Sequence, residues 1–336
     1  MKKVLVTGGT GFLGQKLALK LHSLGQDVTI LGRNLIIGDR LQQLGLKFLP
    51  IDITNSEEIL STISGQEEVF HCAALSSPWG REEEFYKTNV IGTRNIIKGC
   101  LTHRVRRLIY VSTSAVYFNL THRFNLKETD NLAQNPIHPY IKTKQLAEQE
   151  INRGFQQGLP VISIRPRGIF GSGDTVVFPR LLKVSETTGI PLINRGKAIL
   201  DMTYIDNVVD GLLLCQTAPD QVLGEYFNIT NGEPTELFDL LQILSEKLNI
   251  SLKFKPLPYP IAYTLATGME WIYQSFLPGR EPALTRYTLG LLAFSQTLDI
   301  TSAKVKLGYK PRISIAQGLD EFVRHWKHPL KHNNEQ

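Results

Sequence analysis

The 336-residue sequence predicts an α/β protein: a doubly wound parallel sheet, followed by a smaller, mostly helical C-terminal substrate domain. Two observations predict the sheet. A β-branched and leucine-rich run over residues 1–6 leads into glycines at three-residue spacing and then into an amphipathic stretch. Short apolar runs then alternate with helical stretches, which is typical of a parallel sheet with helices on both faces.

The glycine-rich turn after the first strand has the order of elements that a dinucleotide fingerprint requires. Gly8 permits the tight turn, Gly11 lets the backbone approach a pyrophosphate, and Gly14 lets helix and strand pack closely. Phe12 and Leu13 lie at the start of the following helix, whose amino terminus favours phosphate charge. An ordinary glycine turn is the plain alternative, but the context favours a Rossmann-type sheet that binds NAD(P).

The second expected strand, residues 25–31, ends in Gly32 and Arg33. An NAD-preferring site would place an acidic residue there for the ribose hydroxyls, whereas an arginine can pair with a 2′-phosphate. The alternative is a solvated surface arginine. Arg33 therefore favours NADP(H) over NAD(H).

Four later runs are expected to form strands, namely residues 47–51, 68–74, 107–114 and 160–165. Their carboxyl ends carry candidate site residues, because ligands bind at that edge of a parallel sheet. Asp52 and Ile53 are placed to flank an adenine. Ala73 and Ala74 are small enough to let a cofactor lie close, and Thr113 ends the fifth strand among other hydroxyls.

The spacing of Tyr140 and Lys144 is the most informative feature of the chain. On a helix, residues i and i+4 share a face, so we expect the ammonium beside the phenol. A nearby cation favours the charged phenolate and lowers the pKa of the phenol. Such a tyrosine can act as acid or base near neutral pH, which an unassisted one cannot do well.

The expected division places the NAD(P)-binding domain at 1–170, completed by about 200–230, the substrate-binding region at 171–199 and 231–325, and a tail at 326–336. Between 260 and 294, apolar residues recur at helical spacing: Ile261, Leu265, Met269, Ile272 and Phe276. Each of these residues, taken alone, is most simply explained as part of the hydrophobic core. Together they suit an apolar pocket or a membrane-facing lid, and both alternatives stay open.

The composition is ordinary for a globular enzyme, with 42% hydrophobic and 20% charged residues. The net charge of +6 suits a phosphate-rich cofactor or an anionic membrane surface, and no nucleic-acid-binding motif accompanies it. Neither a signal peptide nor a membrane-spanning stretch is apparent. Three widely spaced cysteines lack metal-ligand spacing and indicate reduced thiols. We expect a cytoplasmic protein without a metal site, and leave membrane association open.

As a set, these motifs resemble the extended short-chain dehydrogenase/reductases, the NAD-dependent epimerase/dehydratase superfamily. The resemblance rests on residues 7–14, 52–53, 71–74, 89–93 and the Tyr140–Lys144 pair, and covers nearly the whole chain. It implies that Tyr140 is the acid/base and that Lys144 binds the cofactor ribose. It also implies a catalytic hydroxyl at Thr113, four residues before Tyr117, with Ser112 and Ser114 as near alternatives.

Two departures from the nucleotide-sugar enzymes of this superfamily are informative. The asparagine of their Arg-x-x-Asn motif is replaced by Gly168, and an arginine that holds the diphosphate is replaced by Leu200. Dehydratases also need an acidic pair where Ser114 and Ala115 stand. Four runs are similar to the 3β-hydroxysteroid dehydrogenase branch, namely residues 165–171, 201–207, 231–234 and 307–311. Bacterial long-chain ketoacid reductases of olefin synthesis share these runs and Trp79-Gly80. That branch implies steroid or lipid metabolism, with an apolar substrate that is sterol-like, terpenoid or a long-chain β-hydroxy or keto acid.

Two other functions stay open. One is a nucleotide-sugar epimerase or dehydratase with tightly bound NAD, and the other is a non-catalytic cofactor-binding scaffold. Retention of Thr113, Tyr140 and Lys144 together favours an oxidoreductase acting on a small apolar substrate. A homodimer is left open. His71 is expected to be structural, and Asn89 either braces the active site or caps a helix.

Overall fold

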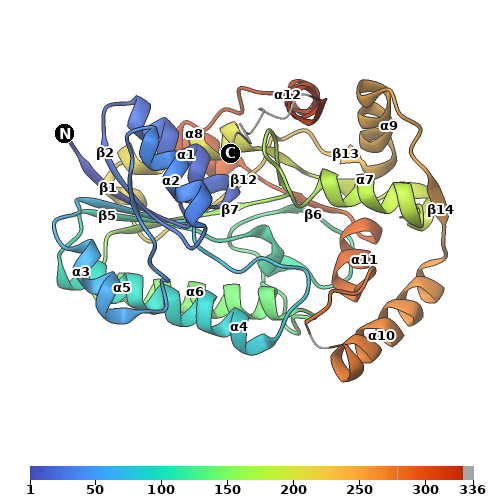
Figure 1. Ribbon diagram of the computed structural model, residues 1–336, viewed down its shortest axis with the longest axis horizontal. Coiled ribbons are helices and arrows are strands. Elements are labelled where there is room, and N and C mark those ends of the chain that lie inside the picture. Colours follow the sequence, from blue (N-terminus) through green and yellow to red (C-terminus); the bar gives the residue numbers. More distant parts are fainter. Residues whose placement is uncertain (278, 328–336) are drawn as a thin grey trace, which may run out of the picture.

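A computed structural model describes residues 1–277 and 279–327 (Figure 1). Its largest element is a seven-stranded sheet in the order β12-β7-β5-β4-β1-β2-β3, in which all neighbouring strands are parallel. The strands are β1 (Lys3–Thr7), β2 (Asp27–Leu31), β3 (Lys47–Leu49), β4 (Glu68–His71), β5 (Arg107–Val111), β7 (Val161–Pro166) and β12 (Tyr226–Ile229). The predicted doubly wound parallel sheet is confirmed.

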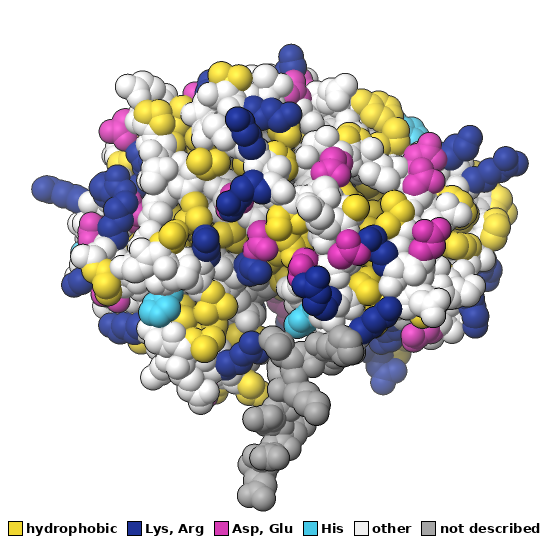
Figure 2. Space-filling view, turned by 90° about the horizontal axis from the view of Figure 1, so that it is seen from above, with side chains coloured by type: hydrophobic (Ala, Val, Ile, Leu, Met, Phe, Trp, Pro, Cys, Tyr) yellow, Lys and Arg dark blue, Asp and Glu magenta, His cyan; other side chains and the backbone are white. Residues whose placement is uncertain are grey.

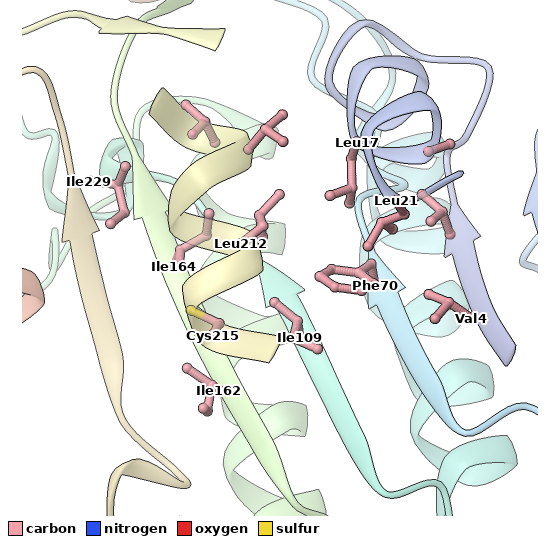
Figure 3. Close-up of a cluster of buried hydrophobic side chains, with 14 of the residues drawn as sticks. Val4, Leu17, Leu21, Phe70, Ile109, Ile162, Ile164, Leu212, Cys215 and Ile229 are labelled. Carbon is pink, nitrogen blue, oxygen red and sulfur yellow. The ribbon is translucent and has the colours of Figure 1, made fainter. Parts of the chain in front are cut away.

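Helices cover both faces of this sheet (Figure 1). One face carries α1 (Phe12–Ser23), α2 (Leu35–Gln43) and α8 (Ile205–Thr217); the other carries α3 (Ser56–Ile63), α5 (Gly92–Thr102) and α6 (Pro139–Gln156). Alternate residues of each strand enter opposite cores: Val4 and Val6 pack on the α1 side, and Leu5 on the α5 side. Figure 3 shows Leu17 and Leu21 of α1 near Phe70 of the sheet.

A short helix, α4 (Glu82–Tyr86), continues through a π-helical turn (Lys87–Ile91) into α5. A 3₁₀ turn (Ser114–Tyr117) follows β5 directly. Both segments lie next to α6. Irregular turns of this kind therefore occur where the carboxyl ends of β4 and β5 approach α6, which is the edge at which a parallel sheet binds its ligands.

The remainder of the chain contains three small sheets besides the expected helices. They are β13-β10-β15-β6, β11-β8 and β14-β9. Their strands are β6 (Arg123–Leu126), β8 (Ile169–Phe170), β9 (Ile190–Leu192), β10 (Ile199–Leu200), β11 (Thr203–Tyr204), β13 (Thr235–Glu236), β14 (Phe254–Pro256) and β15 (Gln296–Leu298). The prediction missed them because strands of two to four residues are too short to show a periodicity.

The helices of this part are α7 (Phe178–Thr187), α9 (Leu237–Leu248), α10 (Tyr259–Phe276), α11 (Arg286–Ala293) and α12 (Ile315–Lys327). α11 packs against α10, which lies at the outer edge of the molecule (Figure 1). Trp326 and Lys327, expected in a tail, form the end of α12, and the rest of that tail lies outside the described residues. Among the described helices, none is long and apolar enough to cross a membrane.

The charged side chains on the face seen in Figure 2 are interspersed. Lys and Arg side chains stand among Asp and Glu side chains there and do not gather in one patch. Oppositely charged side chains also pair between elements: Nζ of Lys16 on α1 lies 3.1 Å from the carboxylate of Asp206 on α8. The charge on this face is therefore of mixed sign.

Candidate active site

The glycine turn after β1 has a geometry that only glycine allows. Gly8 has a φ of +69°, and its carbonyl accepts a hydrogen bond of 2.8 Å from the N–H of Gly11. A Cβ on Gly14 would lie 2.1 Å from the Gly8 carbonyl oxygen. Gly11 precedes α1 and contributes no side-chain cap, so N–H groups of its first turn remain available to an acceptor such as phosphate.

A pocket of about 260 Å³ opens beside this turn, at the carboxyl ends of β1 to β4. Its lining brings together seven of the predicted cofactor-binding residues: Gly8, Gly11, Arg33, Asp52, Ile53, Ala73 and Ala74. Phe12, Leu13 and Gly14 lie in α1 outside the lining, and the first two pack into the core beneath. A glycine cradle next to a pocket of small residues fits the phosphate and adenosine parts of NAD(P).

Arg33 stands at the rim of this pocket. It is 68% exposed, and its Nη1 lies 3.7 Å from Oδ2 of Asp52. Asp52 in turn accepts a hydrogen bond of 2.9 Å from the backbone N–H of Thr54. A long ion pair between two exposed groups is weak, so the guanidinium can turn toward a bound anion at little cost.

The start of α6 places Tyr140 at the carboxyl end of β5. His138 caps the helix, with Nδ1 accepting a hydrogen bond of 3.1 Å from the N–H of Tyr140, and Pro139 occupies the first helical position. Burial raises the pKa of Tyr140, and a hydrogen bond with the Thr113 side chain opposes that rise. The structure thus brings Thr113 and Tyr140 together.

Lys144 approaches a different tyrosine from the one that its spacing suggested. Its Nζ donates hydrogen bonds of 2.6 Å to the Tyr110 hydroxyl and 2.8 Å to the Val111 carbonyl. Burial lowers the pKa of Lys144 to about 7. The expectation that Lys144 lowers the pKa of Tyr140 is therefore wrong for this structure. Burial of the phenol raises the pKa of Tyr140, and the Lys144 ammonium is held by partners on β5.

A buried network lies beneath these residues. Glu148, one turn after Lys144, accepts hydrogen bonds from Ser112 (2.5 Å) and from Nε and Nη2 of Arg165 (2.9 and 2.7 Å). Arg165 also donates to the Tyr117 hydroxyl at 2.5 Å. Because the Ser112 hydroxyl is bonded to Glu148, Thr113 is the better placed of these two hydroxyls to act beside Tyr140. Sequence reasoning missed Tyr110 and Glu148, although Glu148 continues the i+4 series on α6.

Asn89 braces this site. Its Oδ1 accepts from the N–H of Leu75 at 2.7 Å, and its Nδ2 donates to the carbonyl of Leu75 and to Oγ1 of Thr143, both at 3.0 Å. The side chain thereby ties the loop after β4 to α6. Of the two roles left open, bracing is the one that these contacts support.

His71 hydrogen-bonds to the hydroxyls of Thr7 (2.7 Å) and Thr93 (3.0 Å). Burial lowers its pKa to about 3, so it stays neutral. These contacts join β1, β4 and α5, as the expected structural role requires. No cluster of three or more metal-ligating side chains occurs among the residues that the structure describes.

A cluster of apolar and aromatic side chains packs with Tyr140 and forms an apolar wall beside it. Tyr287 of α11 stacks on His138 with ring centroids 4.6 Å apart and meets Phe118 edge-on at 6.0 Å. Leu291 and Phe294 pack against the same cluster. Part of the 260–294 region therefore borders the candidate active site. Its outer part, α10, does not belong to this cluster.

The two departures from the nucleotide-sugar pattern have a structural setting. Gly168 has a φ of +50°, and a Cβ there would lie 3.3 Å from Cγ of Met202. Leu200 belongs to β10, the small-sheet strand that ends just before this methionine. Both positions thus adjoin apolar side chains of the second part of the chain.

The profile of the 3-beta hydroxysteroid dehydrogenase/isomerase family matches residues 5–259. The chain belongs to this family. Accordingly, it is an NAD(P)-dependent oxidoreductase of the epimerase/dehydratase superfamily, as the sequence motifs predicted.

Three similar proteins have sequence matches along nearly their whole length. The protein YbjS of Escherichia coli is 35% identical, over 95% of this chain and 96% of its own. A 2-alkyl-3-oxoalkanoate reductase of Stenotrophomonas maltophilia is 31% identical, over 94% and 97%. A sterol-4-alpha-carboxylate 3-dehydrogenase (decarboxylating) of Mus musculus is 29% identical, over 98% and 92%.

Solved structures share the fold. A UDP-glucuronic acid 4-epimerase from Bacillus cereus, in complex with NAD, superposes with a TM-score of 0.77, covering 98% of this chain and all of its own, at 22% identity. This likeness concerns the Rossmann-type architecture, which epimerases share with reductases.

Proposed function

We propose that this family member interconverts a secondary alcohol and a ketone on an apolar substrate, which is sterol-like, terpenoid or a long-chain β-hydroxy or keto acid. The observation that carries the proposal is the wall of Phe118, Tyr287, Leu291 and Phe294 beside Tyr140. Such a wall stabilises a bound hydrocarbon by about 0.8 kcal/mol for each buried CH₂ group. The names of the reductase and sterol dehydrogenase relatives agree with such substrates.

Tyr140 is the proposed acid/base. In the reducing direction its hydroxyl donates a proton to the substrate oxygen as charge develops there, and in the oxidising direction the phenolate takes that proton back. Thr113 holds the phenol and the substrate oxygen in place, and Lys144 binds the cofactor ribose. When bound, the nicotinamide supplies or accepts the hydride.

The cofactor is proposed to be NADP(H) in preference to NAD(H). Arg33 supports this, because the end of β2 is the position that distinguishes a 2′-phosphate from a 2′-hydroxyl. Asp52 stands opposite and would repel that phosphate. The Asp52 side chain is 42% exposed, so solvent screens its charge.

The exposed face of α10 supports a further expectation, contact with a membrane surface. Ile261, Leu265, Trp271 and Phe276 are 52–68% exposed on this helix, and its glutamate is buried against Arg286. An apolar face with aromatic residues suits the lipid interface. A cytoplasmic protein bound peripherally fits this arrangement. Flotation with phosphatidylglycerol vesicles tests it, and light scattering tests the alternative that the same face forms a homodimer.

Substrate oxidation and reduction assays test the central proposal. Purified protein with NADP⁺ or NADPH is offered sterols, terpenoid alcohols and long-chain hydroxy or keto compounds, and activity should rise with the apolarity of the chain. UDP- and GDP-sugars should be neither bound nor converted. UDP-sugar epimerisation at an ordinary enzymatic rate would overturn the proposal. Cofactor binding without turnover of any compound would indicate a scaffold instead.

A further inference from the structure

Arg167, just after β7, is unusual among the buried arginines of the described residues. Three arginines are buried there: Arg107, Arg165 and Arg167. Arg107 pairs with Asp220 at 2.7 Å, and Arg165 pairs with Glu148 at 2.7 Å. Arg167, only 8% exposed, forms no ion pair within 4.0 Å with any described residue. A buried cation without a direct ion pair is costly, so this position needs an explanation.

The protein contacts of Arg167 leave most of its hydrogen-bonding capacity unused. Its Nη1 donates to Oε1 of Gln296 at 2.6 Å, while Nε2 of Gln296 donates to the Ser114 carbonyl at 3.0 Å. No other side-chain hydrogen bond of Arg167 to a described residue is present, although a guanidinium has five donors. Gln296 therefore links the Arg167 guanidinium, with its unused donors, to the hydroxyl-rich end of β5.

Asp201 is a nearby carboxylate whose charge raises the pKa of Arg167, yet it does not satisfy that arginine. Its Oδ2 accepts from the N–H of Leu298 at 2.9 Å, and its Oδ1 is buried without a hydrogen-bond partner among the described residues. Burial has the larger effect and lowers the pKa of Arg167 to about 10. Two buried groups of opposite charge thus stand close without pairing.

Gln296 connects Arg167 to the candidate active site, because Ser114, whose carbonyl accepts from Gln296, directly follows Thr113. Tyr287 stacks on His138, the N-cap residue of the helix that carries Tyr140. Burial has the largest effect and raises the pKa of Tyr287; charge on Tyr140 adds to that rise, and the Arg167 guanidinium opposes it. Tyr287 also shares a hydrophobic cluster with Tyr140, and this cluster is the proposed apolar wall.

We propose that Arg167 binds the carboxylate of the substrate, so that the site selects β-hydroxy or keto acids, whose hydroxyl or keto group stands close to the carboxyl group, over uncharged apolar alcohols and ketones. This inference rests on the proposed function and narrows its substrate class. The planar fork of a guanidinium matches a carboxylate in two parallel hydrogen bonds. A single cation suits a single negative charge, whereas a nucleotide diphosphate brings at least two. The apolar wall receives the rest of the chain.

The competing explanation is that Arg167 only holds Gln296 and thereby joins β15 to the end of β5. A structural arginine would affect all substrates alike. A carboxylate-binding arginine would affect acids and leave uncharged analogues of the same length nearly unchanged. The ratio of kcat/KM between an acid and its ester therefore separates the two roles.

The test compares three probes with the purified protein and NADP⁺: 3-hydroxydodecanoic acid, its methyl ester, and 2-undecanol, which lacks the carboxyl group. We expect kcat/KM for the acid to exceed that for the ester at least tenfold, as a charged hydrogen bond would give. In Arg167→Met the ratio should fall close to one, mainly through a higher KM for the acid, and Arg167→Lys should recover part of it. Arg107→Met is the matched control, since loss of a buried arginine outside this site should leave the ratio unchanged.

Inhibition of the unaltered protein by dodecanoate and by 1-dodecanol needs no variant, and dodecanoate should inhibit at least tenfold more strongly. Equal inhibition, or an acid-to-ester ratio that Arg167→Met leaves unchanged, would overturn the role of Arg167. Turnover of uncharged alcohols without turnover of acids would do the same while preserving the proposed function. Turnover of no alcohol or ketone from any class would instead remove the proposed function itself.

Discussion

The ammonium of Lys144 donates a hydrogen bond of 2.6 Å to the hydroxyl of Tyr110 on the central sheet. The same nitrogen lies 4.3 Å from the centre of that tyrosine ring and 2.8 Å from the Val111 carbonyl oxygen. Tyr110 and Val111 therefore anchor the side chain that α6 projects toward the cofactor side. The position of Lys144 depends on β5 as much as on its place in the helix.

Replacing Tyr140 with phenylalanine should reduce turnover by orders of magnitude, because no proton donor then meets the developing alkoxide. Cofactor affinity should change little, since the hydroxyl alone is removed. Steady-state rates with NADPH and a long-chain ketone, together with quenching of NADPH fluorescence, measure the two effects. Tyr86→Phe, a change at an exposed tyrosine, is the matched control. Near-native turnover of Tyr140→Phe would show that the acid/base is another group.

Replacing Lys144 with methionine should make the cofactor-free protein relatively more stable at low pH than at high pH. The pKa of Lys144 falls from 10.5 in the unfolded chain to about 7 in the folded one, so the folded state disfavours the proton. The cost of the buried charge is full below pH 7 and disappears as pH rises toward 10.5. Urea unfolding of both proteins at pH 6 and pH 9 measures this difference. A difference independent of pH would contradict the lowered pKa.

Replacing Arg33 with alanine should weaken NADPH binding and leave NADH binding almost unchanged. Loss of a charge-assisted contact to the 2′-phosphate should reduce the NADPH preference by roughly 1–3 kcal/mol. Fluorescence titration with both cofactors measures the preference. Lys16→Ala, which removes a cation paired with Asp206, serves as control. If the unaltered protein binds both cofactors equally, Arg33 has no such role.

Replacing Gly14 with alanine should destabilise the turn, because the added methyl group would lie 2.1 Å from the Gly8 carbonyl oxygen. We expect a loss of about 1–3 kcal/mol in the free energy of unfolding, with weaker cofactor binding. Gly268→Ala in α10 is the matched control, since a Cβ there meets nothing within 4 Å. That change should stabilise by about 0.5–1 kcal/mol through helix propensity. Denaturant unfolding compares the two, and equal effects would contradict the close approach.

Replacing Glu148 with glutamine should destabilise strongly, because Arg165 would remain buried without its charged partner. Breaking a buried pair costs about 3–5 kcal/mol. Glu82→Gln, which removes an exposed ion pair with Lys142, should cost less than about 1 kcal/mol. Urea unfolding measures both, and a small effect at Glu148 would mean that water or a neighbouring group compensates Arg165.

The sequence by itself determined the parallel sheet, the glycine turn and the placement of Tyr140 and Lys144 on one helix. These features are local: hydrophobic periodicity, glycine spacing and an i+4 relationship can all be read along the chain. Asn89 and His71 were recognisable as candidates for the same reason. Their partners were not, because Leu75, Thr143 and Thr93 belong to other segments.

Only the tertiary structure decided how those residues are paired and charged. Lys144 contacts Tyr110 because β5 passes beside α6, and the pKa of Tyr140 rises because packing removes water from the phenol. The isolation of Arg167 is likewise invisible in the sequence, where Arg165 stands two residues away. Arg165 lies within β7 and meets Glu148 of α6, whereas Arg167 follows Pro166, the last residue of that strand, and meets the uncharged Gln296 of β15. Burial and charge compensation are properties of packed segments that lie far apart along the chain.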